Sequence, residues 1–485
     1  MIKNAENKEE EIAIAELGTT YKRTGFHFDK KLEKIGSTIK YFKKNSELSF
    51  CQNEHSKTHK LIIGDNYDAL LNLSISYKGK IDVIYIDPPY GKDDMGEFAD
   101  TNYNNAITRD NLLSMLYPRL VLARQLLSDE GVIFCSIDDK NQAYVKCLFD
   151  EIFGERNFVG NLIWEKKYTV SNDSKGYSDN HDYLVVYTKD FDNAKLGRMP
   201  RTEQMNKAYK NPDNDVRGVW KATPLHAKSG TNTSSYCFPN GIKFMPPLGT
   251  FRRFSDESML RMYNNNEIWF GVNGDAVPSK KTFLSQISSA EGTVPSTLLK
   301  YEKAGLNSDG LLVLKEVFQG QIVFSNPKPV KLIKLLLTIG IQSKGGFVLD
   351  FFAGSGTTGQ AVLELNKEDG GNRTFILCTN NEKTDMNPNG IAYDVTSKRL
   401  KRVMTGSCYD GTNDFEWIKK NSPLGDNLDV FEIADVSNSE QSEGKSAFDV
   451  IDEELYGEVK MSPKDKIKWV SENFSVTQKY LEDRT

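Results

Sequence analysis

The chain contains 485 residues, of which 38% are hydrophobic and 27% charged, with 16 Pro and 36 Gly. This composition excludes collagen-like, low-complexity and wholly disordered proteins, and the length allows for about two to four domains at roughly 100–200 residues each. The formal net charge of −5 argues, taken alone, against a general nucleic-acid-binding protein, which is usually basic.

The predicted elements begin near residue 61, where short apolar runs start to alternate with helical periodicity, as is typical of an α/β fold. Strands are predicted at residues 61–64, 81–87, 132–138, 183–188, 347–352 and 374–379. Most are continuous apolar runs, which is typical of parallel strands buried on both faces. Helices are predicted at residues 109–128, with a kink at Pro118, and at 140–153, 328–339 and 355–365.

The α/β pattern stops near residue 190 and resumes near residue 320, and the stretch between is rich in Asn, Gly, Ser, aromatic and basic residues. We interpret this stretch as an inserted domain. The predicted organisation is an N-terminal extension (1–60), a first α/β half (61–190), the insert (191–320), a second α/β half (321–410) and an acidic C-terminal region (411–485).

The six cysteines form no CxxC pair, so the sequence predicts no disulfide framework. The N-terminus lacks the apolar stretch of a signal peptide, and no run approaches the ~18–20 apolar residues of a membrane span. We therefore expect a soluble cytoplasmic protein. Cys51, His55 and His59 are spaced by four, but no fourth metal ligand is evident, so we expect exposed polar residues there and no metal.

The run IDVIYIDPPYG places Asp87 at the carboxyl end of a predicted strand, where open α/β sheets bind ligands. Pro88 and Pro89 fix the backbone, so the Asp87 carboxylate and the Pro88 carbonyl can present two acceptors beside the ring of Tyr90. This arrangement suits a planar base with an amino group, because accepting both amino hydrogens frees the nitrogen lone pair for methyl transfer. A Pro-Pro turn capped by Asp87 is the structural alternative.

A second motif, FVLDFFAGSGTTGQAVLEL, indicates a strand, a glycine-rich turn and a helix. Gly354, Gly356 and Gly359 satisfy G-x-G-x-x-G, which allows a nucleotide to approach the backbone at a helix N-terminus. Glu382, beyond the next predicted strand, can accept both ribose hydroxyls. Alone, the motif fits a NAD-binding fold or a tight strand–helix turn equally well. Together with an amino-group clamp in the same chain, it indicates S-adenosylmethionine.

DPPY, FAGSGTTG and the preceding FSNPKPVKL (residues 324–332) resemble the motifs of the β-class DNA adenine-N6 methyltransferases. The fuller resemblance, over roughly residues 60–410, is to modification (Mod) subunits of type III restriction–modification systems. It includes IIGDNYDALLN (62–72), residues 103–105, RLVLARQLLS (119–128), GVIFCSIDD (131–139), DEIFGERN (150–157) and HDYLVVY (181–187). One departure is Gly91, where many members carry Asn after the tyrosine.

The resemblance implies a Rossmann-like S-adenosylmethionine-dependent methyltransferase sheet, with the target-base half first, the insert as target-recognition domain and the cofactor half after it. By this resemblance the flipped adenine of double-stranded DNA is held by Asp87, Pro88, Pro89 and Tyr90. The cofactor is bound by Asp350, Phe352, Gly354, Gly356, Thr357 and Glu382, with Asp65 as a further candidate. Lys328 and Pro329 are placed in the helix that covers the methionine end. A homodimer and a restriction (Res) helicase–nuclease partner, in a bacterium or archaeon, are also implied.

The insert carries basic side chains of the kind that contact DNA phosphates, and the candidates are Arg217, Lys221, Arg252, Arg253, Lys280 and Lys281. The acidic C-terminal region sets the sign of the net charge. Any DNA-binding surface is therefore expected to be local, centred on the insert and the DPPY cleft.

The leading hypothesis is a site-specific, adenine-specific DNA methyltransferase. One alternative is an orphan adenine methyltransferase without a restriction partner, and another is an RNA adenine or DNA cytosine-N4 methyltransferase. The cytosine-N4 family usually carries Ser at the position of Asp87, which argues against that interpretation. The remaining alternatives are a NAD-dependent enzyme and a catalytically inert DNA-binding subunit.

Overall fold

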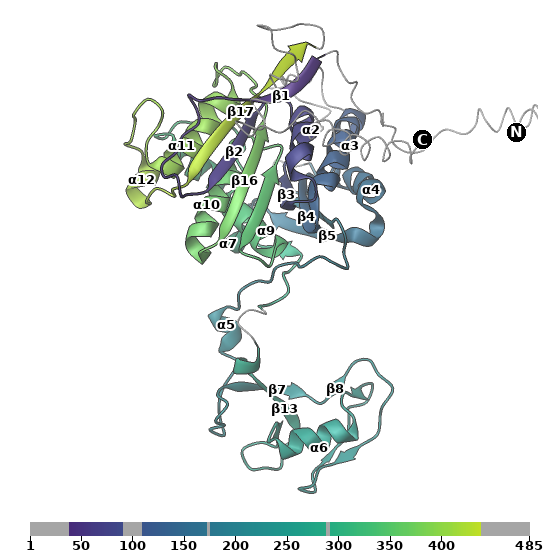
Figure 1. Cartoon of the computed structure of the whole chain (residues 1–485). Coiled ribbons are helices and arrows are strands. Elements are labelled where there is room, and N and C mark those ends of the chain that lie inside the picture. The colour runs from purple at the N-terminus through teal and green to yellow at the C-terminus, as the bar shows by residue number, and fades with distance from the viewer. Residues whose placement is uncertain (1–37, 91–108, 172–174, 288–291, 438–485) are drawn as a thin grey trace, which may run out of the picture. The chain divides into compact units, whose positions relative to one another are not determined.

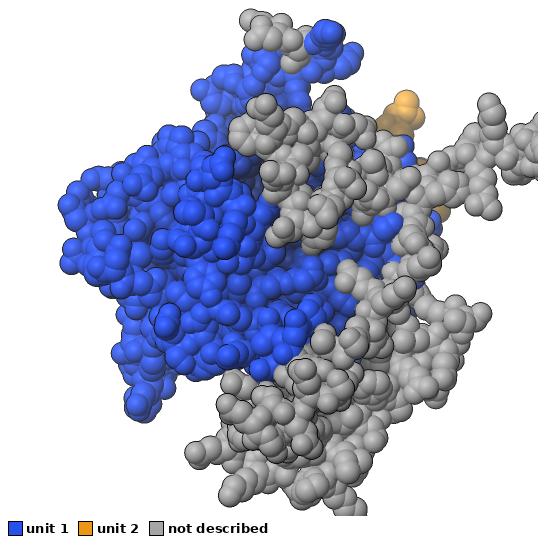
Figure 2. All heavy atoms as spheres, turned by 90° about the horizontal axis from the view of Figure 1, so that it is seen from above, with its two compact units in different colours: residues 1–197, 296–485 blue, residues 198–295 orange. Residues whose placement is uncertain are grey.

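The structure is a computed structural model, and it describes residues 38–90, 109–171, 175–287 and 292–437. Most of the predicted N-terminal extension, Gly91, residues 103–105 and the chain beyond residue 437 lie outside these ranges. The chain divides into two compact units, coloured separately in Figure 2. Unit 1 comprises Met1–Gly197 and Ser296–Thr485, and unit 2 comprises Arg198–Pro295.

Unit 1 contains a ten-stranded sheet in the order β1-β17-β2-β16-β15-β3-β4-β6-β5-β14 (Figure 1). Its strands are β1 (Thr38–Lys44), β2 (Thr58–Ile63), β3 (Ile81–Ile86), β4 (Leu127–Ile137), β5 (Phe158–Glu165), β6 (His181–Thr188), β14 (Leu298–Leu299), β15 (Gly345–Asp350), β16 (Asn372–Thr379) and β17 (Asn427–Ser437). The central strands, from β17 to β4, run parallel, whereas β1 and β6 pair antiparallel with their neighbours.

Among its described residues, unit 1 has the helices α2 (Asn66–Tyr77), α3 (Arg109–Leu126), α4 (Gln142–Phe153), α7 (Tyr301–Ala304), α8 (Asn307–Val317), α9 (Val330–Gly340), α10 (Thr357–Asp369), α11 (Ser397–Thr405) and α12 (Glu416–Lys420). Helix α3 continues through Pro118. The unit also contains a short 3₁₀ turn (Glu155–Asn157) and a π-helical turn (Ala392–Thr396).

Helices cover both faces of the sheet, which makes three layers. Alternate strand residues, such as Ile84 and Ile86, share one apolar core with α2, α3 and α4. The strand residues between them point to the other face, where Gly340 of α9 packs against Val83 and Phe134. The predicted α/β fold is therefore confirmed, and its six predicted strands all lie in this sheet.

The sheet is wider than the sequence indicates. Strands β1, β5, β14 and β17 were not predicted, and neither was α2. Strand β17 alternates apolar with acidic residues, so it has no continuous apolar run, yet Leu428 and Val430 are buried beside β2. Part of the predicted acidic C-terminal region (411–485) is thus a sheet strand.

Unit 2 is shorter than the predicted insert (191–320), because residues 296–320 belong to unit 1. There β14 pairs with β5, and the Trp164 indole donates to the Gly305 carbonyl at 2.8 Å. The elements of unit 2 are α5 (Glu203–Asn206), β7 (Trp220–Pro224), β8 (His226–Ala227), β9 (Tyr236–Cys237), β10 (Lys243–Phe244), β11 (Phe251–Arg252), α6 (Asp256–Asn264), β12 (Ile268–Trp269) and β13 (Ser279–Phe283), with a 3₁₀ turn at Leu284–Gln286. Its own core is formed by Leu225, Phe238, Phe244, Met259, Met262 and Ile268.

The crossover connections place a topological switch point between β15 and β3. From β3 the chain passes through α3 to β4 on one side, and from β15 it passes through α10 to β16 on the other. Ligands of open α/β sheets bind outside the carboxyl ends of the strands at such a point. Within the described residues, no helix is long and apolar enough to cross a membrane.

Candidate active site

The predicted target-base residues lie directly after β3, beside the switch point. Asp87 has the strand parity of Val83 and Tyr85, so it belongs to the sheet face that α9 covers. The Tyr90 hydroxyl donates a hydrogen bond to Asp87 Oδ1 at 3.0 Å, while Pro88 is buried. Burial, together with the Asp87 charge, raises the pKa of Tyr90 well above its usual value, which keeps this hydroxyl protonated as a donor.

Lys328 lies in a different place from the one expected. Helix α9 begins at Val330 with Pro329 as its N-cap, so Lys328 precedes the helix. A residue before proline is pushed to extended conformations, which explains why the helix does not include Lys328. Its ammonium lies 2.8 and 2.7 Å from the two carboxylate oxygens of Asp87 and 3.3 Å from the Tyr90 hydroxyl. Lys328 is therefore a neighbour of the target-base residues.

Asp350 ends β15 and is 2% exposed. Its carboxylate accepts hydrogen bonds from the Thr358 hydroxyl at 2.5 Å and from the Phe352 amide at 3.0 Å. Burial raises the pKa of Asp350 to about 7. Both oxygens of Asp350 are thus bonded to the glycine-rich turn, and this side chain helps to hold the turn in its conformation.

The glycine-rich turn presents bare backbone at the N-terminus of α10. Gly354 and Gly356 have φ values of +48° and +78°, a left-handed region that favours glycine. A Cβ on Gly354 would lie 3.2 Å from the Phe324 ring, and one on Gly356 would lie 3.2 Å from the Thr396 methyl. The Thr357 hydroxyl accepts a hydrogen bond from Arg399 at 2.8 Å. The turn fits a nucleoside-bearing cofactor through its backbone.

Asp65 and Glu382 end the same edge of the sheet, after β2 and β16 respectively. Glu382 is half-buried, and its carbonyl accepts the Ile391 amide at 2.8 Å. Asp65 caps α2 by accepting the Tyr67 amide at 2.8 Å and pairs with Arg119 at 3.1 Å. The acids predicted to bind the cofactor thus share one edge, with Asp65 already engaged in packing the helices.

Sequence reasoning missed Asn66 and Arg119, which connect two helices to the glycine-rich turn. Arg119 on α3 is 2% exposed and donates through Nε to the Asn66 side chain. The Asn66 amide in turn donates to the Phe351 carbonyl at 2.9 Å. The sequence does contain a signal for Arg119, because it interrupts the apolar stripe that includes Leu116 and Leu120. A buried arginine needs a polar partner, so its position predicts one.

A buried acid next to the target-base residues was also missed. Asp182, on β6, is 4% exposed and lies 2.8 Å from the Lys166 ammonium. Burial raises the pKa of Asp182, and the charges of Lys166 and Lys328 oppose that rise. Its neighbour His181 contacts the Tyr183 ring edge-on at 5.0 Å.

His59 is completely buried, whereas the sequence suggested an exposed residue. Its Nδ1 accepts the Phe375 amide at 3.0 Å, and its Nε2 lies 3.2 Å from Asp426 Oδ2. Both ring nitrogens are therefore occupied. In the part of the chain that the structure describes, no group of three His, Cys, Asp or Glu side chains could hold a metal ion.

The six basic candidates of the insert differ sharply in exposure. Lys281 is 1% exposed, lies 3.0 Å from Asp215 and also contacts Asp213, while Arg252 is buried against Asp256. Both cations are therefore engaged in ion pairs within unit 2 and expose little surface to a phosphate.

Arg217 pairs with Asp215 and donates to two backbone carbonyls, so it is also committed within unit 2. Lys221 and Arg253 are exposed, and Lys280 is half-exposed. Arg253 and Lys280 both lie against the Phe254 ring, at 5.5 and 5.6 Å. These three cations remain available to a ligand.

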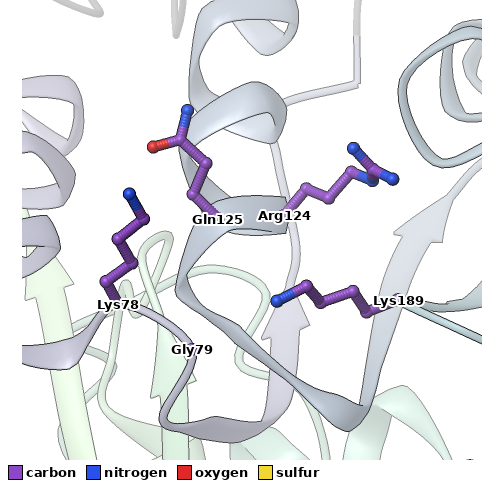
Figure 3. A pocket seen from close by; sticks show the side chains of 5 residues that line it. All are labelled: Lys78, Gly79, Arg124, Gln125 and Lys189. Carbon is purple, nitrogen blue, oxygen red and sulfur yellow. The ribbon is translucent and has the colours of Figure 1, made fainter. Parts of the chain in front are cut away.

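A hollow of about 360 Å³ lies where β3 and β4 begin and is lined by Lys78, Gly79, Arg124, Gln125 and Lys189 (Figure 3). Lys78 and Arg124 lie at the C-terminal ends of α2 and α3, where cations offset the helix dipoles. Lys189 donates to the Leu127 carbonyl at 2.8 Å and pairs with Asp129. The positions of Lys78, Arg124 and Lys189 are thus explained by their contacts within the fold, without a ligand.

A family profile described as DNA methylase, of the N6/N4 type, matches residues 81–387, and one described as an uncharacterised conserved protein matches residues 2–83. The chain is 36% identical to the StyLTI Mod subunit, a type III restriction–modification enzyme of Salmonella typhimurium, over 67% of this chain and 53% of that protein. It is 30% identical to the EcoPI Mod subunit of Escherichia phage P1, over 75% and 65%. The chain thus spans about half to two thirds of these two relatives.

Among solved structures, the chain is similar to the PvuII cytosine-N4-specific DNA methyltransferase, at 12% identity and a TM-score of 0.35 over 67% of this chain and 82% of that one. It is also similar to a putative DNA modification methylase of Thermus thermophilus complexed with S-adenosyl-L-methionine, at 13% identity and a TM-score of 0.34 over 77% and 99%. These scores are too low to carry an argument, whereas the DNA methylase profile covers more than half of the chain and includes both motifs at the switch point. The chain belongs to the N6/N4 DNA methylase family.

Proposed function

We propose that this DNA methylase transfers a methyl group from S-adenosylmethionine to N6 of adenine in duplex DNA, as the modification subunit of a type III restriction–modification system. The observation that carries the choice of adenine is the Asp87 carboxylate at the end of β3, hydrogen-bonded to Tyr90 beside the switch point. A carboxylate accepts an amino hydrogen as a charged acceptor, whereas the serine usual in cytosine-N4 enzymes offers a neutral hydroxyl.

The residues at the switch point divide into two roles in this proposal. When bound, S-adenosylmethionine supplies an electrophilic methyl group. Gly354, Gly356 and Glu382 are the residues that would hold it, through bare backbone at a helix N-terminus and a carboxylate suited to ribose hydroxyls. The Asp350 side chain, bonded within the turn, keeps that backbone in shape.

On the other side of the switch point, Asp87 and the Pro88 carbonyl would each accept one hydrogen of the adenine amine, and Tyr90 would stack on the ring. Accepting both hydrogens directs the nitrogen lone pair out of the ring plane, which turns a poor nucleophile into a better one. Asp87 is also the acceptor placed to take the amino proton that leaves as the new bond forms. The base must leave the duplex to reach these groups.

Replacing Asp87 tests this assignment. Asp87→Ala should lower the methylation rate by about 100-fold or more, because it removes the charged acceptor that acts in the transition state. Cofactor affinity, measured by calorimetry, should remain, since the cofactor residues follow other strands. Asp139→Ala, an exposed acid just after the neighbouring strand β4, serves as the matched control. Near wild-type methylation by Asp87→Ala would exclude the proposed role.

The methylated base should be identified directly. DNA from cells that express the protein should contain N6-methyladenine within one sequence motif, detected by long-read sequencing and by nucleoside analysis of digested DNA. N4-methylcytosine in that digest would redirect the proposal to the cytosine-N4 branch, and a product on RNA alone would exclude DNA as the substrate.

The assignment as a Mod subunit rests on the resemblance to type III Mod subunits. It implies two partners, a second copy of this chain and a restriction subunit. Light scattering on the purified protein should report the mass of two 54.8 kDa chains. A mass of one chain under all conditions would favour an orphan methyltransferase over a Mod subunit.

A further inference from the structure

The ammonium of Lys328 occupies the positions that the proposed target base needs. It lies 2.8 and 2.7 Å from the two Asp87 oxygens, which the amine of adenine would use. It also lies 5.3 Å from the centroid of the Tyr90 ring, the face on which a base would stack. A positively charged nitrogen above an aromatic ring and against a carboxylate imitates an aminated base in the same pocket.

We propose that Lys328 is a latch on the target-base pocket, which holds Asp87 until a flipped base displaces it. The proposal rests on the proposed function, because it assumes that Asp87 receives the amine of the target base. In the latched state the carboxylate is neutralised and both of its oxygens are bonded. When the base enters, its amine replaces the Lys328 ammonium as the hydrogen-bond donor to Asp87.

The chemistry of methyl transfer explains why the latch must open. The amine nitrogen gains positive charge as it forms its fourth bond, and Asp87 stabilises that charge only when no second cation shares it. An ammonium 2.7 Å from the carboxylate would oppose the developing charge. The flexible four-carbon stem of lysine allows the ammonium to leave by side-chain rotation, without a change of backbone.

The backbone beneath the latch is held firmly, so the movement is confined to the Lys328 side chain. A Cβ on Gly310 of α8 would overlap the Pro327 carbonyl oxygen, which shows that α8 packs directly on the chain before Lys328. On the other side, Pro329 is buried at the start of α9, and a Cβ on Gly305 would lie 3.2 Å from it. The side chains of the pair are 12% and 25% exposed, so solvent can replace the ion pair when it opens.

Removing the charge of Lys328 tests the latch. The full-length protein is compared with Lys328→Met, Lys328→Gln and Lys328→Arg on a duplex that carries its recognition motif. The measurements are kcat, KM for DNA, and the fluorescence of 2-aminopurine at the target position, which rises when the base leaves the stack. Lys331→Met, which replaces an exposed lysine in the first turn of α9, controls for the loss of a positive charge near DNA.

Both neutral variants should lower KM for DNA by about fivefold to tenfold and raise the 2-aminopurine signal, because a base no longer competes with an ion pair. Their kcat should stay within about threefold of wild type. Lys328→Arg should restore the wild-type KM, and Lys331→Met should not lower it. If one neutral variant fails to bind cofactor, the other is used in its place. Met and Gln differ in polarity, but both remove the positive charge.

Two results would overturn the latch while leaving the proposed function intact. A large fall in kcat at unchanged KM would mean that Lys328 acts during transfer, and unchanged values of both would mean that it does not compete with the base. Wild-type formation of N6-methyladenine is measured first in the same preparation. If no methylated adenine forms, the proposed function fails and the latch fails with it.

Discussion

Asp87 and Asp350 are aspartates at the carboxyl ends of two neighbouring parallel strands, yet their surroundings give them different chemistry. Asp87 is half-buried, accepts a hydrogen bond from Tyr90 and lies against the Lys328 ammonium. Asp350 is enclosed by the turn that it shapes, and burial raises its pKa to about 7. Their sequence contexts, an apolar strand followed by a turn, are nearly the same.

The pH dependence of stability should report the burial of Asp350. Because its pKa is raised in the folded protein, the native state keeps a proton that the unfolded chain releases above pH ~4. Stability from this group is therefore lost as pH rises through about 7. The free energy of unfolding should fall by about 1 kcal/mol more in the wild type than in Asp350→Asn between pH 6 and pH 8, measured by urea denaturation. Parallel pH profiles for the two proteins would contradict this account.

At the scale of elements, the sheet extends beyond the sequence-predicted strands through polar contacts that join distant segments. Strands β2, β16 and β17 meet at His59, whose ring stacks on Phe375 with centroids 4.1 Å apart. Its two nitrogens bond a backbone amide of β16 and the Asp426 carboxylate just before β17. His59, which is spaced by four from His55 in the sequence, is therefore a buried side chain that links three strands.

Replacing His59 should weaken this part of the sheet. His59→Leu should lower the free energy of unfolding by about 2 kcal/mol at pH 7.5, because two buried polar partners lose their bonds. Burial lowers the pKa of His59, so the native state resists a proton that the unfolded chain binds below pH 6.5. The wild type should thus lose stability as pH falls from 7.5 to 5.5, and His59→Leu should lose less. Thermal melts at the two pH values measure this, with His55→Leu, at an exposed position, as the control. An equal acid sensitivity of all three proteins would exclude His59 as the cause.

At the scale of the whole molecule, a net charge of −5 coexists with membership of a DNA methylase family. Net charge does not show where the charges lie: several cations of unit 2 form internal ion pairs, whereas others are exposed. Lys281 and Arg252 stabilise the fold of unit 2, whereas Lys221, Arg253 and Lys280 face solvent at least in part. A count of basic residues therefore overstates the charge that DNA can meet.

The salt dependence of DNA binding should separate the two groups of cations. Replacing Arg253 and Lys280 together by Gln should reduce the slope of log affinity against log salt by about 2, at roughly 0.9 per lost phosphate contact. The matched control replaces Lys419 and Lys420, exposed on α12 of unit 1, by Gln. If both pairs change the slope equally, or neither does, the proposed DNA contacts of unit 2 are wrong.

Local patterns predicted much of the fold and brought out the residues of the candidate site. The six predicted strands are all in the sheet, because an apolar run bounded by turn residues suits a strand that is covered on both faces. The edge strand β1 and the acidic β17 escaped prediction, because their burial comes from a neighbour that is far away in the sequence. Asn66 and Arg119 escaped for the same reason, since their role depends on a contact with Phe351 across the sheet.

The sequence by itself determined the family, the α/β class and the two motifs, because DPPY and G-x-G-x-x-G consist of residues that are close together in the chain. Only the tertiary structure decided which partners surround single side chains in and around these motifs and in unit 2. It placed Lys328 on Asp87, a residue 241 positions away, and enclosed Asp350 and Lys281 in internal bonds. The physical reason is that the charge state, partners and accessibility of an ionisable group are set by whatever packs around it, and those neighbours come from distant parts of the chain.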